Sequence, residues 1–279
     1  MEYEPLKRRL NVILKMFPFT RKIFYFLLDA VILRQWYVKR AIRNYLSKNK
    51  LNFYDAGSGF GQYSCYVLKH YPAAEILAVD IDEEISEAFR RFINKRYPKQ
   101  VKIEKADLQN YIPENKQDMI IAIDILEHIE DDLTVLKNFR KVIDEEGYLI
   151  ISTPYAGKEA EYTAEHVRNG YTIEELEGKL NEAGWEIQEF WFSYGFWGNI
   201  AWHLGMKIPL SEFKCLLRIL LPFYLLLVYP FVLVMMVLDY NSKNRKGKGM
   251  VVVARGIKDE EAKQASSTDT HRLENDTHR

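Results

Sequence analysis

Apolar runs alternate with helix-like segments from Leu51 to Pro154. The apolar runs are LNFYDA, EILAVD, VKIEKAD, DMIIAID and GYLIIST, and the segments with helical spacing between them are 62–70, 84–96 and 131–143. Runs of this length are typical of buried strands. Strands that alternate with helices in this way predict a parallel sheet with helices on both faces.

One more helix and two more strands are predicted beyond this region. Residues 171–185 have an amphipathic helical pattern, and Thr172 followed three residues later by Glu175 predicts a capping box at its start. The stretches WEIQEFWFS, at about 185–193, and GMVVVAR, at 249–255, indicate strands. The last 22 residues, KDEEAKQASSTDTHRLENDTHR, have almost no apolar content, which predicts a disordered tail.

The chain has no net charge, but two of its segments are both basic and apolar. Residues 1–50 hold 12 Lys+Arg against 3 Asp+Glu, and residues 197–248 hold 7 against 2. The same two segments contain the longest apolar and aromatic runs. This combination favours an anionic membrane surface over nucleic acid as a partner.

A glycine-rich loop, DAGSGFG, follows the first predicted strand and precedes a helix. Glycines in such a loop let the backbone approach a ligand closely. Gly57, Gly59 and Gly61 give G-x-G-x-G, which differs from the dinucleotide fingerprint G-x-G-x-x-G and from the P-loop with its Gly-Lys-Ser/Thr end. The loop alone is also compatible with an ordinary turn that binds nothing.

Two aspartates at the ends of neighbouring strands favour a ligand. Asp80 ends the second strand, where a carboxylate can accept both ribose hydroxyls, and Asp107 follows the third strand. Either one alone could be a helix N-cap. Because the carboxyl ends of successive parallel strands line one crevice, the loop and both aspartates together indicate a nucleoside-containing cofactor.

These motifs resemble the class I S-adenosylmethionine-dependent methyltransferases, and within them the ubiquinone and menaquinone type. The likeness rests on the D-x-G-x-G-x-G loop, the acidic end of strand two, LEH after strand four and, more loosely, HVRNGYTIEELEGKLNEAGW. It implies an enzyme with S-adenosyl-L-methionine as cofactor. It also implies an α/β fold with a doubly wound, mainly parallel, seven-stranded Rossmann-like sheet whose last strand is antiparallel.

The resemblance implies a division of the chain and a set of cofactor contacts. The expected parts are an N-terminal amphipathic helical extension (1–48), a methyltransferase domain (49–257) with an apolar insertion between strands six and seven at about 196–247, and the tail (258–279). Asp55 and the glycines would hold the methionine part, Asp80 the ribose, and Asp107 with Leu108 the adenine. The expected cofactor-binding residues are Asp55, Ala56, Gly57, Ser58, Gly59, Gly61, Asp80, Ile81, Asp107, Leu108 and Asp124.

The expected catalytic residues are Asp124, Glu127, His128 and His166. Asp124 closes the fourth predicted strand, and Glu127 and His128 are expected to begin the next helix, with all three facing the mouth of the crevice. In members similar to the ubiquinone O-methyltransferases, E-x-x-E-H binds a divalent cation, but this chain has an aspartate in the first position. A helix start, an acid–base or substrate contact, and a metal site therefore remain alternatives for Glu127 and His128, and no residue is assigned as a metal ligand. His166 lies in a region that covers the substrate in this fold. The two cysteines lack metal-ligand spacing.

Residues 219–238 carry no charge and are long enough to span a bilayer. Since they lie between two strands of one sheet, the chain must return to the side it left, as a hairpin or a shallow pair of interfacial helices. Pro222 and Pro230 are placed to bend or break the helix. A basic rim around an apolar segment favours monotopic attachment, and packing on the domain or on a dimer partner is the alternative.

The sequence therefore predicts a methyltransferase on the cytoplasmic face of a membrane, peripheral or monotopic. The expected reaction is O-methylation of a hydrophobic or lipid-like membrane-resident acceptor. One alternative is a soluble small molecule or a protein as acceptor, with the insertion serving only as an anchor or a homodimer interface. Another is a non-catalytic, cofactor-binding scaffold. No nucleic acid is expected as a partner.

Overall fold

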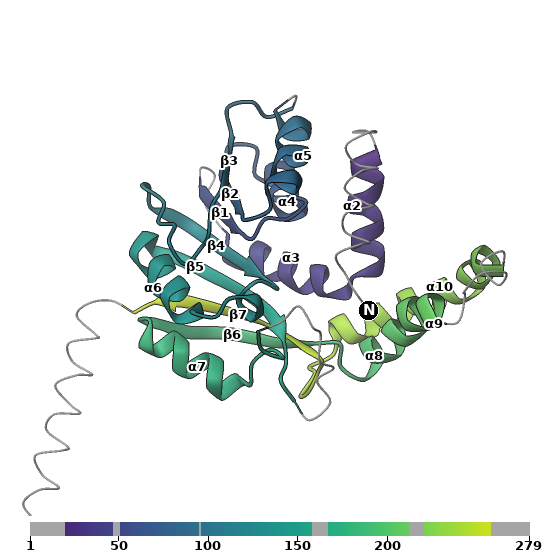
Figure 1. Ribbon diagram of the computed structural model, residues 1–279. Coiled ribbons are helices and arrows are strands. Elements are labelled where there is room, and N and C mark those ends of the chain that lie inside the picture. The colour runs from purple at the N-terminus through teal and green to yellow at the C-terminus, as the bar shows by residue number, and fades with distance from the viewer. Residues whose placement is uncertain (1–19, 47–50, 95, 158–166, 212–219, 258–279) are drawn as a thin grey trace, which may run out of the picture.

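A seven-stranded sheet forms the centre of the molecule (Figure 1). The computed structural model describes residues 20–46, 51–94, 96–157, 167–211 and 220–257. The strands are β1 (Asn52–Ala56), β2 (Glu75–Asp80), β3 (Val101–Lys105), β4 (Gln117–Ile123), β5 (Ile143–Pro154), β6 (Trp185–Ser193) and β7 (Gly249–Gly256). Their order is β3-β2-β1-β4-β5-β7-β6, with β1 to β5 parallel and β7 antiparallel to both neighbours. The predicted fold class is confirmed.

Helices cover both faces of this sheet. The helices are α2 (Thr20–Val31), α3 (Leu33–Tyr45), α4 (Gln62–His70), α5 (Glu83–Ile93), η1 (Leu126–His128), α6 (Asp132–Val142), α7 (Ile173–Glu182), α8 (Phe196–Trp202), η2 (His203–Lys207), α9 (Ile208–Ser211) and α10 (Leu221–Asn241). Because successive strand residues face opposite sides, Ile121 packs in a core shared with α3, α4 and α5, and Ile120 in a core shared with α6 and α7. Two hydrophobic cores therefore hold the layers together.

Local signals set the helix ends as expected. Thr172 accepts a hydrogen bond from the backbone N–H of Glu175, whose carboxylate accepts one from the N–H of Thr172, so the capping box is present. One expectation is wrong: Glu127 and His128 do not begin the helix after β4. They lie in the separate one-turn helix η1, and α6 starts only after its own cap, Asp131.

The apolar insertion between β6 and β7 is a helical hairpin. Ser193, at the end of β6, pairs with Gly249, at the start of β7, so the chain leaves and re-enters the sheet at one place. Helices α8, η2 and α9 lead outward and α10 returns along them, projecting away from the sheet (Figure 1). Neither proline breaks α10: Pro222 lies in its first turn, where it is tolerated, and the helix continues through Pro230.

A buried aspartate fixes the base of this hairpin. Asp239 is fully buried on α10, and its carboxylate accepts hydrogen bonds from the Tyr37 hydroxyl (2.9 Å) and the Gly198 backbone N–H (2.9 Å). Tyr37 belongs to α3 and Gly198 to α8. Burying a carboxylate is costly unless it is hydrogen-bonded, so these contacts tie α10 to the N-terminal extension and to the outgoing helix.

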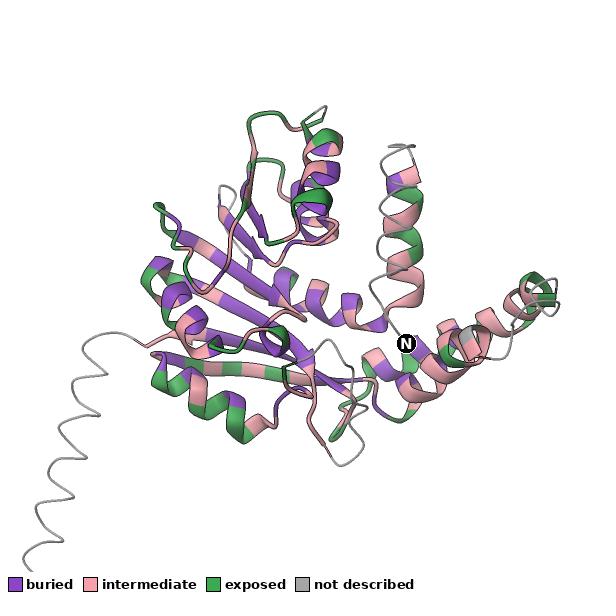
Figure 2. Ribbon diagram, viewed as in Figure 1, coloured by how far each residue is buried: buried purple, intermediate pink, exposed green. Residues whose placement is uncertain are grey.

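The two helices of the N-terminal extension differ in burial. Helix α3 packs into the core through Tyr37, Val38, Ala41 and Ile42. Helix α2 exposes Ile23, Phe26 and Leu27 to 51–70%. Figure 2 shows the contrast between the buried strands and the half-buried or exposed residues of α2 and α10. The extension therefore belongs to the domain through α3, while one face of α2 is left uncovered.

Candidate active site

The glycine loop closes over the end of β2. The backbone N–H groups of Gly57 and Ser58 both donate to the Val79 carbonyl oxygen, at 2.8 and 3.0 Å. The N–H of Gly59 donates to Asp80 Oδ2 at 2.7 Å. All three loop glycines have positive φ, the region that favours glycine. The sequence spacing thus marks a tight loop whose backbone is held by the second strand.

The loop has one open side. A Cβ added to Gly59 would meet nothing within 4 Å, whereas at Gly57 it would lie 2.8 Å from Ile125 and at Gly61 2.3 Å from the Phe89 ring. Ser58 Oγ, next to Gly59 in the loop, is buried without a hydrogen-bond partner in the described part of the chain. Unpaired buried polar atoms are unfavourable, so the open side has the character of a cradle for a polar ligand.

The acidic ends of β2 and β3 lie on the same edge of the sheet. Asp80 is 9% exposed, and its second oxygen accepts the N–H of Asp82 at 2.9 Å, so backbone donors fix the orientation of the carboxylate. Ile81 beside it is 66% exposed. Asp107 accepts the Gln109 N–H at 3.0 Å, and Leu108 is buried. The arrangement offers a carboxylate for hydroxyls and apolar side chains for a flat ring, and these cofactor contacts stay predictions.

Asp55 is turned away from the open side of the loop. Its carboxylate is buried and accepts the Ser64 hydroxyl of α4 at 2.6 Å. Burial raises the pKa of Asp55 to about 7, against the opposing effect of the hydrogen bonds from Ser64. In this structure Asp55 joins β1 to α4 and so supports the loop from inside. A contact of its carboxylate with the methionine part of the cofactor stays a prediction.

An arginine from the N-terminal extension lies beside the acidic end of β4. Asp124 follows β4 with φ of 51°, accepts the Ser152 hydroxyl at 3.2 Å and forms an ion pair with Arg34 of α3. The two side chains are 22% and 27% exposed. Arg34 was not among the expected site residues. It lies 90 positions before Asp124 in the sequence, and the only sequence signal was the basic character of its segment.

Glu127 is buried, which differs from the expected position at the mouth of the crevice. The side chain is 1% exposed, Oε2 accepts the Thr153 hydroxyl at 3.3 Å, and Oε1 has no partner in the described part of the chain. Burial first, and the nearby Asp124 carboxylate second, raise the pKa of Glu127 to about 8. His128 next to it is exposed. The catalytic roles predicted for Asp124, Glu127 and His128 stay predictions.

A buried network that the sequence did not reveal holds the η1 turn in place. Arg168 Nη1 donates to the Leu126 carbonyl oxygen at 3.0 Å and to Asp132 Oδ2 at 2.7 Å. The Tyr171 hydroxyl and Lys179 also bind the Asp132 carboxylate. These contacts tie the LEH turn to the start of α6 and to the segment before α7. The stretch HVRNGY carried the signal, through its family resemblance.

The structure describes only part of what was expected for His166 and for a metal site. His166 lies outside the described residues. Among the described residues, no group of three His, Cys, Asp or Glu side chains lies in a position to hold a metal ion.

Fold and site together define a methyltransferase of the class I type. The family described as Methyltransferase domain matches residues 47–190, about half of the chain, and the chain belongs to that family. The predicted class of enzyme and its cofactor, S-adenosyl-L-methionine, are thereby confirmed.

The individual proteins that this chain resembles share little of its sequence. Malonyl-[acyl-carrier protein] O-methyltransferase 1 of Ilyobacter polytropus is 27% identical over 107 residues, 38% of this chain and 39% of that protein. The chain thus spans about two fifths of the length of the curated relative it matches. An O-methyltransferase of a Brevibacillus brevis multienzyme, crystallised with S-adenosyl-L-homocysteine, has a TM-score of 0.53 at 17% identity and covers 74% of this chain and 67% of its own.

The fold by itself does not decide the reaction. The [4+2]-cyclase SpnF is similar too, with a TM-score of 0.56, 16% identity and coverage of 81% of this chain and 80% of its own. At these identities the likeness shows a shared fold only. Residues of the site must therefore carry any further conclusion about the chemistry.

The residues present fit S-adenosylmethionine. The cofactor brings a methyl group on a sulfonium, which is already activated for transfer. The open side of the glycine loop and the unpaired Ser58 oxygen suit its amino-acid part, and the fixed Asp80 carboxylate suits its ribose. What remains for the protein is to align the acceptor and exclude water.

We expect the buried Glu127 to make the stability of the protein fall as pH rises. The unfolded glutamate loses its proton near pH 4.5, whereas the folded one keeps it to about pH 8. Between these values the unfolded state binds fewer protons, so its population is favoured by rising pH. Glu127→Gln cannot ionise, so urea midpoints at about pH 5 and about pH 9 should differ less for this variant than for wild type. An equal loss in both proteins would contradict the assignment.

Proposed function

We propose that the chain methylates an oxygen atom of a hydrophobic, membrane-resident acceptor, working at the cytoplasmic face of a membrane with S-adenosylmethionine as methyl donor. The observation that carries this proposal is the uncovered apolar hairpin fixed beside the crevice. Attachment would be monotopic, with the hairpin in the surface of the bilayer and the sheet outside it.

The apolar surface of α10 supports membrane contact. Large apolar side chains on α10 and just before it are exposed to 40–74%. They are Leu220, Phe223, Leu226, Leu227, Phe231, Val234, Val237 and Leu238. Only Val232, Met236 and Asp239 of α10 are buried, on the seam that faces the domain. By length and composition α10 could span a membrane, with a hydropathy of 2.4. An exposed apolar surface of this extent is typical of an interaction site.

The return of the chain supports surface attachment over a single crossing. Because Ser193 and Gly249 are paired neighbours in the sheet, both ends of the insertion lie on the same side of any membrane. One helix that crossed alone would leave β7 on the wrong side. The basic side chains that follow α10, Lys243, Arg245 and Lys246, are exposed and suit an anionic headgroup layer.

The hairpin and the crevice are joined by one helix, which supports an acceptor that comes from the membrane. Helix α3 places Arg34 against Asp124 in the crevice and, one turn later, Tyr37 against Asp239 at the hairpin base. An acceptor dissolved in the bilayer would therefore have a short path to the methyl donor. The name of the curated relative, an O-methyltransferase, supports an oxygen as the acceptor atom. Glu127, with a pKa of about 8, is near the range suited to a general base.

We expect charges on the apolar surface of α10 to abolish vesicle binding and lipid methylation without loss of fold. The variant Leu226→Glu/Phe231→Glu replaces side chains that are 74% and 64% exposed. Each lost apolar contact should weaken vesicle binding by about tenfold or more. The measurements are flotation with vesicles of membrane lipid and transfer of labelled methyl groups from S-adenosylmethionine to extracted lipid. Ile112→Glu, at a 46% exposed apolar position elsewhere, is the matched control and should float like wild type.

Four outcomes would contradict the proposal in different ways. Flotation of the α10 variant like wild type would remove the membrane contact. Loss of a homodimer in that variant, with no vesicle binding by wild type, would make α10 a dimer interface and leave the acceptor soluble. If the Asp80→Ala variant methylated lipid as well as wild type does, the observed labelling would not use this site. Binding of S-adenosylmethionine by wild type without any turnover would indicate a scaffold.

A further inference from the structure

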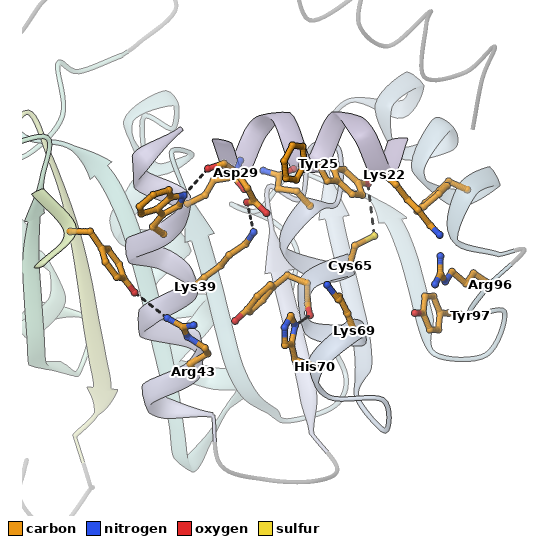
Figure 3. A pocket seen from close by; sticks show the side chains of 17 residues that line it. Lys22, Tyr25, Asp29, Lys39, Arg43, Cys65, Lys69, His70, Arg96 and Tyr97 are labelled. Carbon is orange, nitrogen blue, oxygen red and sulfur yellow. Dashed lines mark hydrogen bonds and ion pairs between the residues drawn. The ribbon is translucent and has the colours of Figure 1, made fainter. Parts of the chain in front are cut away.

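A cavity of about 760 Å³ lies outside the crevice, between the N-terminal extension and the outer sides of α4 and α5 (Figure 3). Helix α2 contributes Lys22 and Phe26, α3 contributes Trp36 and Lys39, and α4 contributes Lys69. The volume is in the range of small-molecule sites. The methyl-transfer site does not use this cavity, since the residues expected to hold the cofactor lie at the carboxyl edge of the sheet.

The cavity is lined mainly by cations. Lys22, Lys39, Arg43, Lys69 and Arg96 surround it, and Asp29 is the one carboxylate among its lining residues (Figure 3). Asp29 forms an ion pair with Lys39. In the part of the chain that the structure describes, no carboxylate pairs with the other four. The cavity therefore carries uncompensated positive charge.

Three of these positive charges, on Lys39, Arg43 and Lys69, lie close enough to affect one another. Burial lowers the pKa of Lys39, the ion pair with Asp29 opposes this, and the nearby cations Lys69 and Arg43 lower the pKa further. The ammonium group of Lys39 also lies 5.0 Å from the centroid of the Tyr66 ring. Clustered cations of this kind are relieved by an anionic ligand.

Aromatic side chains give the same cavity an apolar wall. Phe26, Trp36, Phe92 and Tyr97 are among its lining residues. Phe26 is 70% exposed, and Ile23 and Leu27 on the same helix are also exposed. The apolar wall thus continues from the cavity onto the outer face of α2, where a hydrocarbon chain would find further contact. A free phosphate would leave this wall unused.

We propose that this cavity binds one anionic lipid molecule, with its headgroup phosphate among Lys22, Lys39 and Lys69 and its hydrocarbon against Phe26 and Trp36. The cations that line the cavity suit the phosphate, and its aromatic side chains suit the hydrocarbon. The proposal does not rest on methyl transfer or on the insertion of α10. It goes beyond non-specific attraction to a charged surface because the cations face a cavity that an apolar wall also lines.

A bound lipid would stabilise the contact of α2 with the glycine loop. The Tyr25 hydroxyl donates to the Phe60 carbonyl oxygen at 2.6 Å, and Arg21 Nη1 donates to the same oxygen at 3.3 Å. Phe60 lies between Gly59 and Gly61 of the loop. A ligand that joins Lys22 on α2 to Lys69 on α4 would therefore hold α2 against the loop.

The test is calorimetric titration of the full-length protein with short-chain phosphatidylglycerol below its micelle concentration. Phosphatidylcholine of the same chain length, inorganic phosphate and a single-stranded oligonucleotide are titrated beside it. We expect phosphatidylglycerol alone to bind. Equal binding of phosphatidylcholine would remove the role of the cations. Equal binding of inorganic phosphate would make the site one for soluble anions, and stronger binding of the oligonucleotide would make it a nucleic-acid site, so each of these results overturns the proposal.

Two lysines that pair with no carboxylate in the described part of the chain give a clean variant. Lys22→Gln/Lys69→Gln should weaken phosphatidylglycerol binding by about fivefold per charge, roughly thirtyfold for the pair. Its control, Lys137→Gln/Lys141→Gln, removes two exposed charges on α6, outside the cavity, and should bind like wild type. Equal loss in both variants would show non-specific electrostatics and overturn the proposal. Phe26→Ser, at an exposed position, tests the apolar wall independently and should also weaken binding.

Discussion

Gly61→Ala is expected to be the most destabilising single alanine substitution in the glycine loop. Gly61 has φ of +74°, and an added Cβ would lie 2.3 Å from the ring of Phe89. Phe89 is fully buried in the core that α4 and α5 share. Overpacking costs about 1–3 kcal/mol and the left-handed conformation about 1–2 kcal/mol, so the free energy of unfolding should fall by about 2–5 kcal/mol. Urea denaturation monitored by circular dichroism measures this loss.

Gly59→Ala is the matched control in the same loop. It has φ of +49°, but its Cβ would meet nothing within 4 Å, so only the conformational cost of about 1–2 kcal/mol applies. The folded variant should nevertheless bind S-adenosylmethionine much more weakly, since its new methyl group enters the open side of the loop. Equal stability of the two variants would contradict the packing of Gly61 on Phe89. Unchanged cofactor binding by Gly59→Ala would contradict the cradle.

The sheet and the glycine loop could be predicted because their signals are local. The alternation of apolar runs and helical segments marks each strand from Leu51 to Pro154. The capping box of Thr172 and Glu175 involves residues three positions apart, and the structure contains it. Gly57, Gly59 and Gly61 all have positive φ, as a loop of that spacing requires. Each of these features depends on near neighbours in the chain.

The direction of individual side chains could not be predicted in the same way. Asp55 faces Ser64 of α4, because its place in the alternation of β1 turns it to the face that α4 covers. Glu127 is buried because the η1 turn is held down by Arg168, whose partner Asp132 lies in another helix. Both outcomes depend on contacts between elements that no short sequence pattern encodes.

Contacts between residues far apart in the sequence also determine how the N-terminal extension packs. The sequence predicted an amphipathic helical extension over residues 1–48, and α2 exposes Ile23, Phe26 and Leu27. The structure adds that α3 lies in the core and carries Arg34 to Asp124. Composition shows that a segment has cations but does not show which carboxylate each of them meets. For this reason Arg34 was missing from the expected site.

Arg34→Met should destabilise the protein by about 2–3 kcal/mol near pH 8 and by clearly less near pH 5. Removing one partner of a fully buried ion pair costs about 3–5 kcal/mol. We expect a smaller cost here because the Arg34 and Asp124 side chains are 27% and 22% exposed. Burial already raises the pKa of Asp124, and Arg34 opposes this effect. Without the arginine, the carboxyl groups of Asp124 and Glu127 would be protonated more readily, so low pH relieves the defect and high pH exposes it.

A double-mutant cycle separates this ion pair from a general loss of packing. Asp124→Asn keeps a residue that tolerates the φ of 51° at this position, and it removes the charge that Arg34 balances. If the pair is the cause, Arg34→Met/Asp124→Asn should be more stable near pH 8 than Arg34→Met alone, with a coupling energy of about 1–3 kcal/mol. A cost of Arg34→Met that is equal at both pH values and is not relieved by Asp124→Asn would mean that Arg34 acts through packing alone. The crevice would then contain an uncompensated Asp124–Glu127 pair, and its charge would have to be balanced by the sulfonium of the cofactor.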